Sequence, residues 1–303
     1  MKLPVYANAP HIHHKLTNLS SNLLFTLALM PAFVYSVFLY GYAKLWLLIV
    51  VLAGVLLAAA LGYLFKRYPL RACCLSSLPF AVLWALIFPL GSLWPAFISS
   101  FLAIFISRQV FGGFGNALVN PAVVAYSLSA MLWPNLFWQP QPLAPLNYDW
   151  YQWLLALPSD SFLAVFVHNF MGINGGAIIN GSGLLVIAVI FIWLFKLRSP
   201  LITIMFLVIY IFINYIFNFD ILFNLSNEGF LVGLFILASA NEGLPHSGLG
   251  GIIYAVLLAL LTILLGPLVN GDIFYAIFVM SFVNLLINTM VRYLWQQRYQ
   301  RIK

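Results

Sequence analysis

The segment from Ala72 to Ser107 carries no Asp, Glu, Lys or Arg, and it constrains the fold more than any other part of the chain. Two helices that each cross a bilayer need about 40 apolar residues, which is more than this segment contains. Pro89, Gly91 and Pro95 interrupt it near its middle. Non-helical backbone at membrane depth is tolerated only where protein buries it or where it lines a cavity. We therefore predict broken or re-entrant helices here.

The composition indicates a membrane protein along the whole chain, since 64% of the residues are hydrophobic and only 6% are charged. We predict an all-α polytopic membrane protein that forms a single membrane domain over residues 1–303. About ten apolar stretches are candidates for transmembrane helices. The predicted spans are 22–41, 45–65, 72–90, 92–107, 117–134, 178–195, 200–219, 229–241, 250–268 and 273–291.

The positions of the cations predict the orientation, because cytoplasmic loops are rich in Lys and Arg. If the N-terminus is cytoplasmic, ten spans place 12 of the 13 cations on the cytoplasmic side, and Lys44 alone falls outside. We predict cytoplasmic tails at 1–20 and 292–303 and an outer loop at 135–176. The net charge of +7 is then a signal for topology, and we predict the lipid bilayer, not nucleic acid, as its partner.

A glycine-rich turn follows Arg108 between two apolar spans, within the sequence RQVFGGFGNALVNPAVVAYSLSAMLWP. Glycines leave one face of such a turn without Cβ atoms, so a flat ligand could approach the backbone closely. The candidate binding residues are Arg108, Phe111, Gly112, Gly113, Phe114, Gly115, Asn116 and Asn120. The alternative interpretation is that the glycines only let two helices pack tightly in lipid.

Other reactive side chains give weaker signals. His11, His13 and His14 have no neighbouring carboxylate or cysteine, and we predict no metal there. Cys73 and Cys74 are adjacent and lack the spacing of a metal site, so we predict that they pack in the core. The sequence contains no evident pair of carboxylates and no nucleophile beside a base, and we predict no catalytic side chain.

Two segments suggest an internal repeat of five helices plus five helices. The segment that begins at Ser76 and the one that begins at Ser226 each contain a short apolar helix, a break with Gly and Pro, and a longer helix. Because five spans separate the two copies, they would enter the membrane from opposite sides and form an inverted repeat. The alternative is that two unrelated hydrophobic hairpins have converged.

These motifs resemble one family: the D subunit of the Rnf ion-translocating electron transport complex, which is similar to the B subunit of the sodium-pumping NADH:quinone reductase. The resemblance rests on the glycine-turn sequence above, on Ala9-Pro10-His11-Ile12, and on GFLVGLFILASANEGLP from Gly229 to Pro245. It implies ten helices in an inverted repeat, a fold likened to urea and ammonium channels, and the bacterial inner membrane. It also implies iron–sulfur, flavin and membrane subunits as partners, and translocation of Na⁺ or H⁺.

Two departures from the family limit what the resemblance implies. The family attaches FMN to the Thr of a Ser-Gly-Ala-Thr-Pro-Leu motif after the fifth span, where this chain has Ala144 and Pro145 in QPLAPL. We therefore expect no covalent FMN. The family's Ala-Thr-Asp-Pro is replaced by ASAN at 238–241, which leaves Glu242 as the nearest carboxylate.

The resemblance places the glycine turn near the family's non-covalent riboflavin and quinone region. We therefore predict that the turn binds non-covalent riboflavin, FMN or quinone. The predicted function is a membrane subunit of an Rnf-like or Nqr-like redox-driven ion translocase without covalent FMN. The alternatives are a channel or transporter for a small solute or ion, which would hold no cofactor, and an assembly subunit without a ligand.

Overall fold

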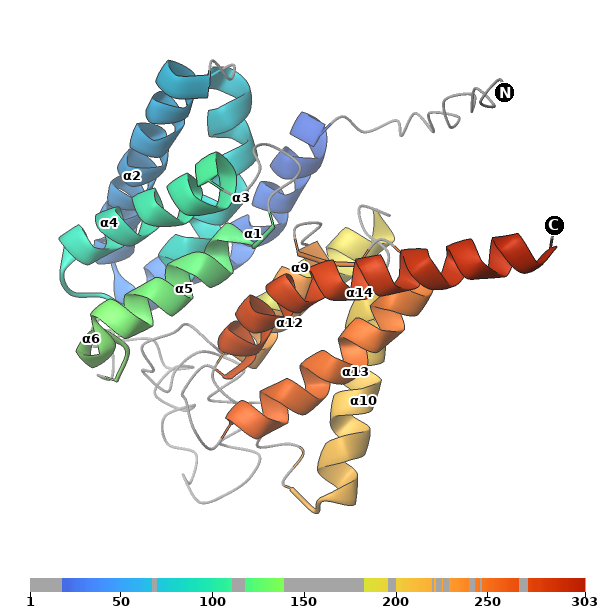
Figure 1. Ribbon diagram of the computed structural model, residues 1–303. Helices are drawn as coiled ribbons and strands as arrows, with labels where there is room; N and C mark the ends of the chain where they lie inside the picture. Colours follow the sequence, from blue (N-terminus) through green and yellow to red (C-terminus); the bar gives the residue numbers. More distant parts are fainter. Residues whose placement is uncertain are drawn as a thin grey trace.

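The computed structural model shows a bundle of helices, and the residues it describes contain no β-strand (Figure 1). The described residues are 18–66, 70–110, 118–138, 183–195, 200–219, 221, 225, 229–239, 243–245, 247–266 and 272–302. The helices are α1 Asn18–Tyr40, α2 Ala43–Lys66, α3 Leu70–Ile87, α4 Leu93–Ile104 with the π-helix η1 Phe105–Val110, α5 Pro121–Leu132, α6 Pro134–Trp138, α9 Gly183–Leu194, α10 Leu201–Ile216, α12 Phe230–Ser239, α13 Gly248–Leu265 and α14 Asp272–Ile302.

Each predicted span overlaps a helix, and five helical stretches are long and apolar enough to cross a membrane. These five are Ser20–Tyr40, Ala43–Phe65, Leu93–Val110, Gly248–Leu265 and Ile273–Leu294. The helices α3, α5, α9 and α10 are also apolar but shorter within their described parts, and α12 is shorter still. The all-α polytopic membrane class is therefore confirmed, while the number of ten complete spans stays a prediction.

The predicted break lies between α3 and α4. Helix α3 ends at Ile87 and α4 begins at Leu93, so Pro89 and Gly91 fall in the connection. Gly91 has φ of +149°, a conformation that side-chain-bearing residues rarely adopt. Pro95, which we expected at the break, lies instead in the first turn of α4. A proline is tolerated there because the N–H that it lacks would have no partner in the helix.

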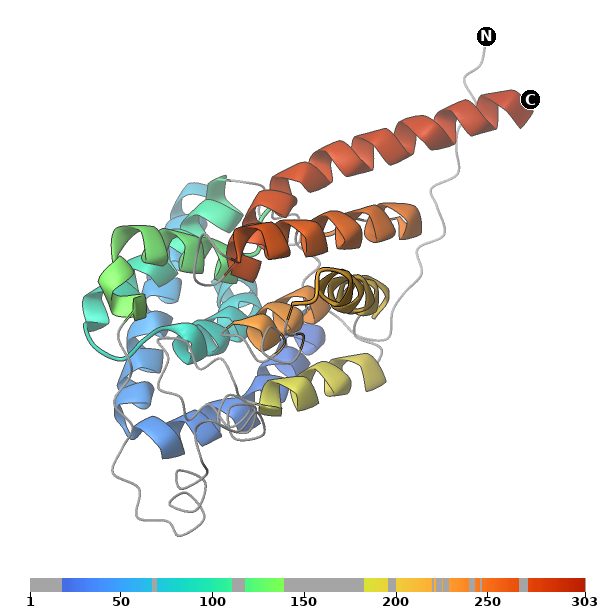
Figure 2. The ribbon, with the colours of Figure 1, turned by 90° about the horizontal axis from the view of Figure 1, so that it is seen from below.

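The last predicted span and the predicted C-terminal tail form one continuous helix, α14. No Gly or Pro occurs between Asp272 and Ile302 to end it. Figure 2 shows the C-terminal part of α14 running out beyond the other helices. The predicted N-terminal tail up to residue 17 and the outer loop from 139 to 176 lie outside the described residues.

Small residues let α2 and α4 pack closely. Gly54, Ala58 and Gly62 recur every four residues along α2, which is the spacing of one helix face. A Cβ on Gly54 would collide with Ser100 Oγ and would lie 2.7 Å from the carbonyl oxygen of Phe97. Backbone of α4 therefore lies directly against Gly54, and this contact requires glycine.

The same order of helix pairing recurs in the two parts of the bundle. In the first part α1 packs on α3, α2 on α3 and α4, and α5 on α3 and α4. In the second part α9 packs on α12, α10 on α12 and α13, and α14 on α12 and α13. If α9, α10, α12, α13 and α14 are matched in order with α1 to α5, each of these five pairings has its counterpart. The contacts of α1 with α2 and of α3 with α4 are not matched to the same extent among the described residues of the second part. The two parts meet where α1 contacts α9 and α5 contacts α14.

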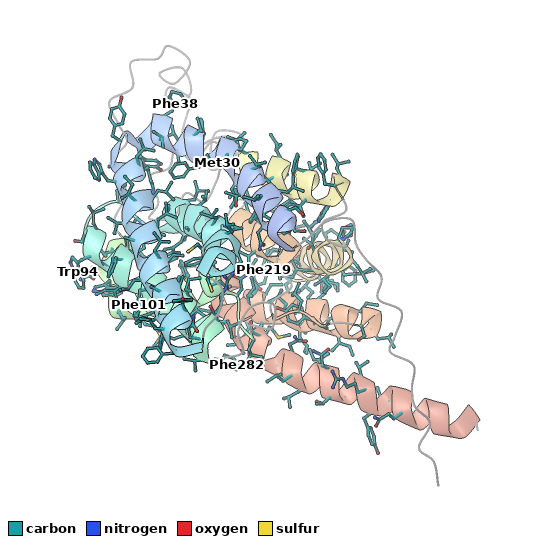
Figure 3. The ribbon with its side chains drawn as sticks, turned by 90° about the horizontal axis from the view of Figure 1, so that it is seen from above. Met30, Phe38, Trp94, Phe101, Phe219 and Phe282 are labelled. Atoms are coloured by element: carbon teal, nitrogen blue, oxygen red, sulfur yellow. The ribbon has the colours of Figure 1, made fainter. Side chains whose placement is uncertain are left out.

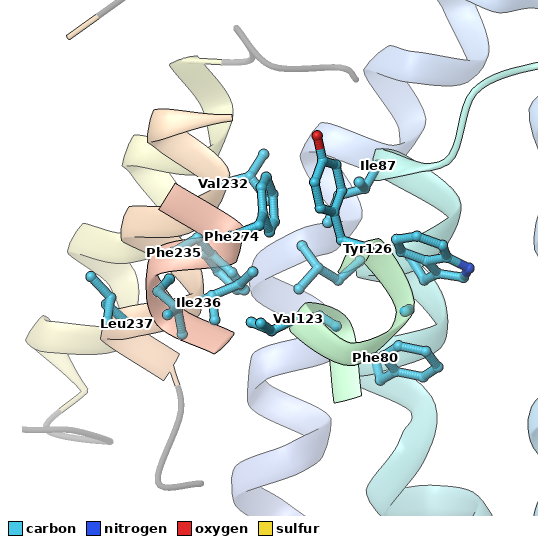
Figure 4. Close-up of a cluster of buried hydrophobic side chains, with 14 of the residues drawn as sticks. Phe80, Ile87, Val123, Tyr126, Val232, Phe235, Ile236, Leu237 and Phe274 are labelled. Carbon is cyan, nitrogen blue, oxygen red and sulfur yellow. The ribbon is translucent and has the colours of Figure 1, made fainter. Parts of the chain in front are cut away.

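Apolar side chains fill the junction between the two parts and also cover much of the exterior. Tyr126 of α5 stacks on Phe274 of α14, with ring centroids 4.1 Å apart and an interplanar angle of 16° (Figure 4). On the outside, Phe38 and Trp94 point away from the bundle and are 59% and 57% exposed (Figure 3). Exposed aromatic residues of this kind are expected on a surface that faces lipid.

Candidate functional site

Arg108 lies in the last turn of the α4–η1 helix, one residue beyond the end of the predicted span 92–107. Its side chain is only 7% exposed. A π-helical turn such as η1 inserts one residue per turn relative to an α-helix and is frequent at functional sites. The helix continues past the predicted end of the span, and the charge is buried, because partners on another helix bind the guanidinium group.

Those partners are two serines of α3. Nη1 of Arg108 donates to Ser76 Oγ at 2.9 Å and to Ser77 Oγ at 2.7 Å, and Nη2 donates to the carbonyl oxygen of Ser76 at 3.1 Å. Both serine hydroxyls donate in turn to the carbonyl oxygen of Cys73. Cys73 is buried, as expected for a residue that packs in the core, whereas Cys74, for which we made the same prediction, is only partly buried. Arg108 therefore joins the C-terminal end of the α4–η1 helix to the N-terminal half of α3. This link fixes where the glycine turn begins.

Gln109 packs against α2 beside this junction. It is 8% exposed, and its side-chain amide occupies the space that a Cβ on Gly62 would fill. Gly62 therefore allows a polar side chain to be buried between α2 and η1. The helices α2, α3 and α4–η1 thus converge where the glycine turn starts. A turn whose start is fixed in this way can hold its backbone groups in a defined position.

The glycine turn itself spans residues that lie outside the described part of the chain. The predicted binding residues Phe111, Gly112, Gly113, Phe114, Gly115 and Asn116 all belong to it, and their role as a binding site stays a prediction. The structure describes the two ends of the turn, Val110 and Leu118. Different elements hold the two ends: η1, packed beside α2 and α3, carries Val110, and the segment before α13 lies against Leu118.

The far end of the turn lies against the segment that precedes α13. A Cβ on Gly243 would lie 3.1 Å from the carbonyl oxygen of Leu118 and 2.9 Å from Ser281 Oγ of α14. Gly243 has φ of +76°, so its conformation as well as the space around it favours glycine. Two of the segments that resemble the Rnf and Nqr family, distant in sequence, therefore meet at this point. Nothing in the sequence alone indicates this contact.

Asn120, the last predicted binding residue, has a structural role. Its Oδ1 accepts a hydrogen bond from the main-chain N–H of Ala122 at 2.9 Å, and Pro121 occupies the first position of α5. This is a helix N-cap followed by the residue most suited to the first helical position. Asn120 ends the turn and starts α5, as Arg108 fixes the beginning of the turn.

Comparison with known proteins tests the family directly. Residues 5–295 match the family described as NQR2, RnfD, RnfE. The chain belongs to this family. It is 28% identical, over 278 residues, to the D subunit of the Na⁺-translocating ferredoxin:NAD⁺ oxidoreductase complex of Acetobacterium woodii, a match that covers 86% of this chain and 84% of the relative.

Two further relatives match over shorter stretches, and both are named as the D subunit of an ion-translocating oxidoreductase complex. The relative in Aeromonas salmonicida is 30% identical over 131 residues, which cover 42% of this chain and 37% of the relative. The relative in Pectobacterium atrosepticum is 24% identical over 179 residues, which cover 55% and 51% of the two chains. The family resemblance inferred from the sequence is therefore confirmed.

Lys44 is a buried cation that the sequence analysis did not recognise as a site. It is 2% exposed, and Arg108 is the other buried cation among the described side chains. The predicted topology already set Lys44 apart, because it was the one cation of 13 that ten spans did not place on the cytoplasmic side. Lys44 does not follow the rule for cytoplasmic loops because it lies in helix α2 and is buried there.

Proposed function

We propose that this chain is the D-type membrane subunit of an Rnf-like redox-driven ion-translocating complex. The match to the family over residues 5–295 carries this proposal. It is supported by the relative from Acetobacterium woodii, named as the D subunit of a Na⁺-translocating ferredoxin:NAD⁺ oxidoreductase complex. The chain's partners are then other subunits of such a complex, including iron–sulfur and flavin subunits, in the bacterial inner membrane with both termini in the cytoplasm.

The helix arrangement supports the fold that this function requires. The pairing order shared by α1 to α5 and α9 to α14, and the meeting of α1 with α9 and of α5 with α14, are the contacts expected of a five-plus-five repeat and support that prediction. In inverted repeats, functional sites lie where broken helices of the two halves approach each other. The contact between Leu118 and Gly243 is an approach of this kind.

We place a site for a non-covalent flavin or quinone at the glycine turn. Arg108 anchors the start of the turn on α3, while Asn120 and Gly243 define its end. An isoalloxazine or quinone ring needs apolar walls, a few hydrogen-bond donors and a close approach to backbone. Phe111, Phe114 and the glycines of the turn would supply these features. We propose no covalent FMN, because Ala144 stands where the family has the Thr that carries it, although Pro145 and Leu146 match the residues after that Thr.

The proposed role predicts a loss of coupled transport when the chain is removed. Inverted membrane vesicles from cells that lack it should lose ion uptake driven by the complex's electron donor, and the tagged chain should co-purify with flavin and iron–sulfur subunits. Vesicles that keep donor-driven ion uptake would contradict the proposal. A chain that purifies alone and conducts a small solute in liposomes would instead support the channel or transporter alternative.

Binding at the turn is tested separately with Gly113→Val, and Gly248→Ala serves as its matched control because, in the part of the chain that the structure describes, nothing lies within 4 Å of a Cβ at Gly248. The β-branched side chain at Gly113 should lower the flavin or quinone content of the purified complex, while the control should retain it. Full occupancy in Gly113→Val would remove the turn from the proposed site without affecting the proposed role of the subunit.

A further inference from the structure

The C-terminal end of α3 is buried at the point where the helix breaks. Helix α3 ends at Ile87, and Pro89 two residues later cannot extend it. The last carbonyl groups of a helix have no partner within that helix, and they carry the negative end of the helix dipole. Ala85 and Phe88 are both fully buried, so their carbonyl oxygens need a partner from elsewhere in the protein.

Lys44 provides that partner from the start of α2. Its Nζ donates to the carbonyl oxygen of Phe88 at 2.9 Å and to that of Ala85 at 3.2 Å. It also lies 5.5 Å from the centroid of the Tyr40 ring, within the range of a cation–π contact. The tight turn at Gly41, with φ of +73°, brings the end of α1 and the start of α2 together around this point.

This set of groups has the chemistry of a site for a monovalent cation. Main-chain carbonyl oxygens at helix C-termini coordinate alkali cations in membrane transport proteins, and an aromatic face adds attraction for a positive charge. We propose that the C-terminal end of α3 is a monovalent-cation site that Lys44 fills from within the chain. The tethered ammonium holds the broken helix in place and prevents ions from solution from binding at this end of α3.

The Lys44 site and the flavin site are tested independently, because the contacts of Lys44 that the structure describes are with Tyr40 of α1 and with the C-terminal end of α3. Replacing Lys44 by alanine removes the ammonium group and its stem, which leaves room for a small amine. The probe is n-propylammonium chloride, which can donate N–H bonds to the two carbonyls. Tetramethylammonium chloride at the same concentration is the control salt, since it carries the same charge but has no N–H.

We expect purified Lys44→Ala to melt about 3–6 °C below the parent, because two buried hydrogen bonds from a charged donor are lost. Propylammonium should recover at least half of this loss, tetramethylammonium should recover none, and the parent should respond equally to both salts. An equal response of Lys44→Ala to the two salts would overturn the proposal, as would an unchanged melting temperature.

A second variant keeps the proposal testable if Lys44→Ala does not accumulate. Lys44→Met retains an apolar stem but no charge, so it should melt below the parent and show no recovery with propylammonium. Arg292→Met, which removes an exposed cation from α14, is the matched control for loss of charge. If Lys44→Met and Arg292→Met melt at the same temperature, the Lys44 ammonium does not hold the end of α3 and the proposal fails.

Discussion

Replacing Arg108 by methionine tests whether the hydrogen bonds from Arg108 to Ser76 and Ser77 of α3 fix the start of the glycine turn. The change removes three hydrogen bonds to α3 while keeping an apolar stem of similar length. Ser76 and Ser77 can still donate to the carbonyl oxygen of Cys73, so neither hydroxyl is left without a partner. The cost is then mainly the loss of the bonds donated by the arginine.

The size of the effect follows from those three bonds. Hydrogen bonds between helices in membrane proteins contribute about 0.6 kcal/mol on average and reach about 1.7 kcal/mol, and bonds from charged groups lie toward the upper end. We expect Arg108→Met to lower the free energy of unfolding by about 2–4 kcal/mol. At an unfolding entropy of about 2.1 cal/mol/K per residue, a chain of 303 residues should then melt about 3–6 °C lower.

The assay is thermal melting of the detergent-solubilised chain at a fixed scan rate, followed by the fluorescence of its nine tryptophans. Arg108→Lys keeps the charge but not the planar fork, so it should lose about half as much stability as Arg108→Met. Arg292→Met removes an exposed cation and should stay within about 0.5 kcal/mol of the parent. If Arg108→Met melts within 1 °C of Arg292→Met, about the scatter of such scans, the junction is not held by Arg108.

Two other contacts give predictions with matched controls. Gly54→Ala should destabilise the bundle by about 1–3 kcal/mol, because its Cβ would lie 2.7 Å from backbone of α4 that cannot rotate away. The control Gly248→Ala should leave the stability unchanged. Equal melting temperatures of the two variants would contradict close packing of α2 on α4. Tyr126→Ala should cost about 3–5 kcal/mol through loss of the stack on Phe274, and Tyr126→Phe should keep most of the stability. Equal losses in both variants would show that the ring stack does not join the two parts.

Sequence patterns predicted the helices and the break well, since hydrophobicity and the positions of Pro and Gly act locally. The connection at Pro89 and Gly91 is an example, because each residue disfavours helix by its own backbone chemistry. The burial of Arg108 could not be predicted in this way. It depends on Ser76 and Ser77, which lie more than 30 residues earlier and come close to Arg108 only when α3 and the α4–η1 helix both pack against α2.

The sequence singled out the glycine turn as the candidate site, which stays a prediction, but it did not indicate the contacts at the two ends of the turn. The glycine turn was recognised from its composition, whereas the N-cap role of Asn120 and the contact between Leu118 and Gly243 appear only in the folded chain. Lys44 shows the same limit. Its exceptional position in the charge distribution was visible, but its partners at the end of α3 were not.

The flavin content of the complex tests the central claim most directly. The complex should be purified with its native partners, the visible spectrum recorded, and the subunits separated after denaturation and examined for flavin fluorescence. We predict that the native complex contains flavin and that none stays attached to this chain after denaturation. Flavin fluorescence on the denatured chain, or a complex without any flavin, would contradict the account.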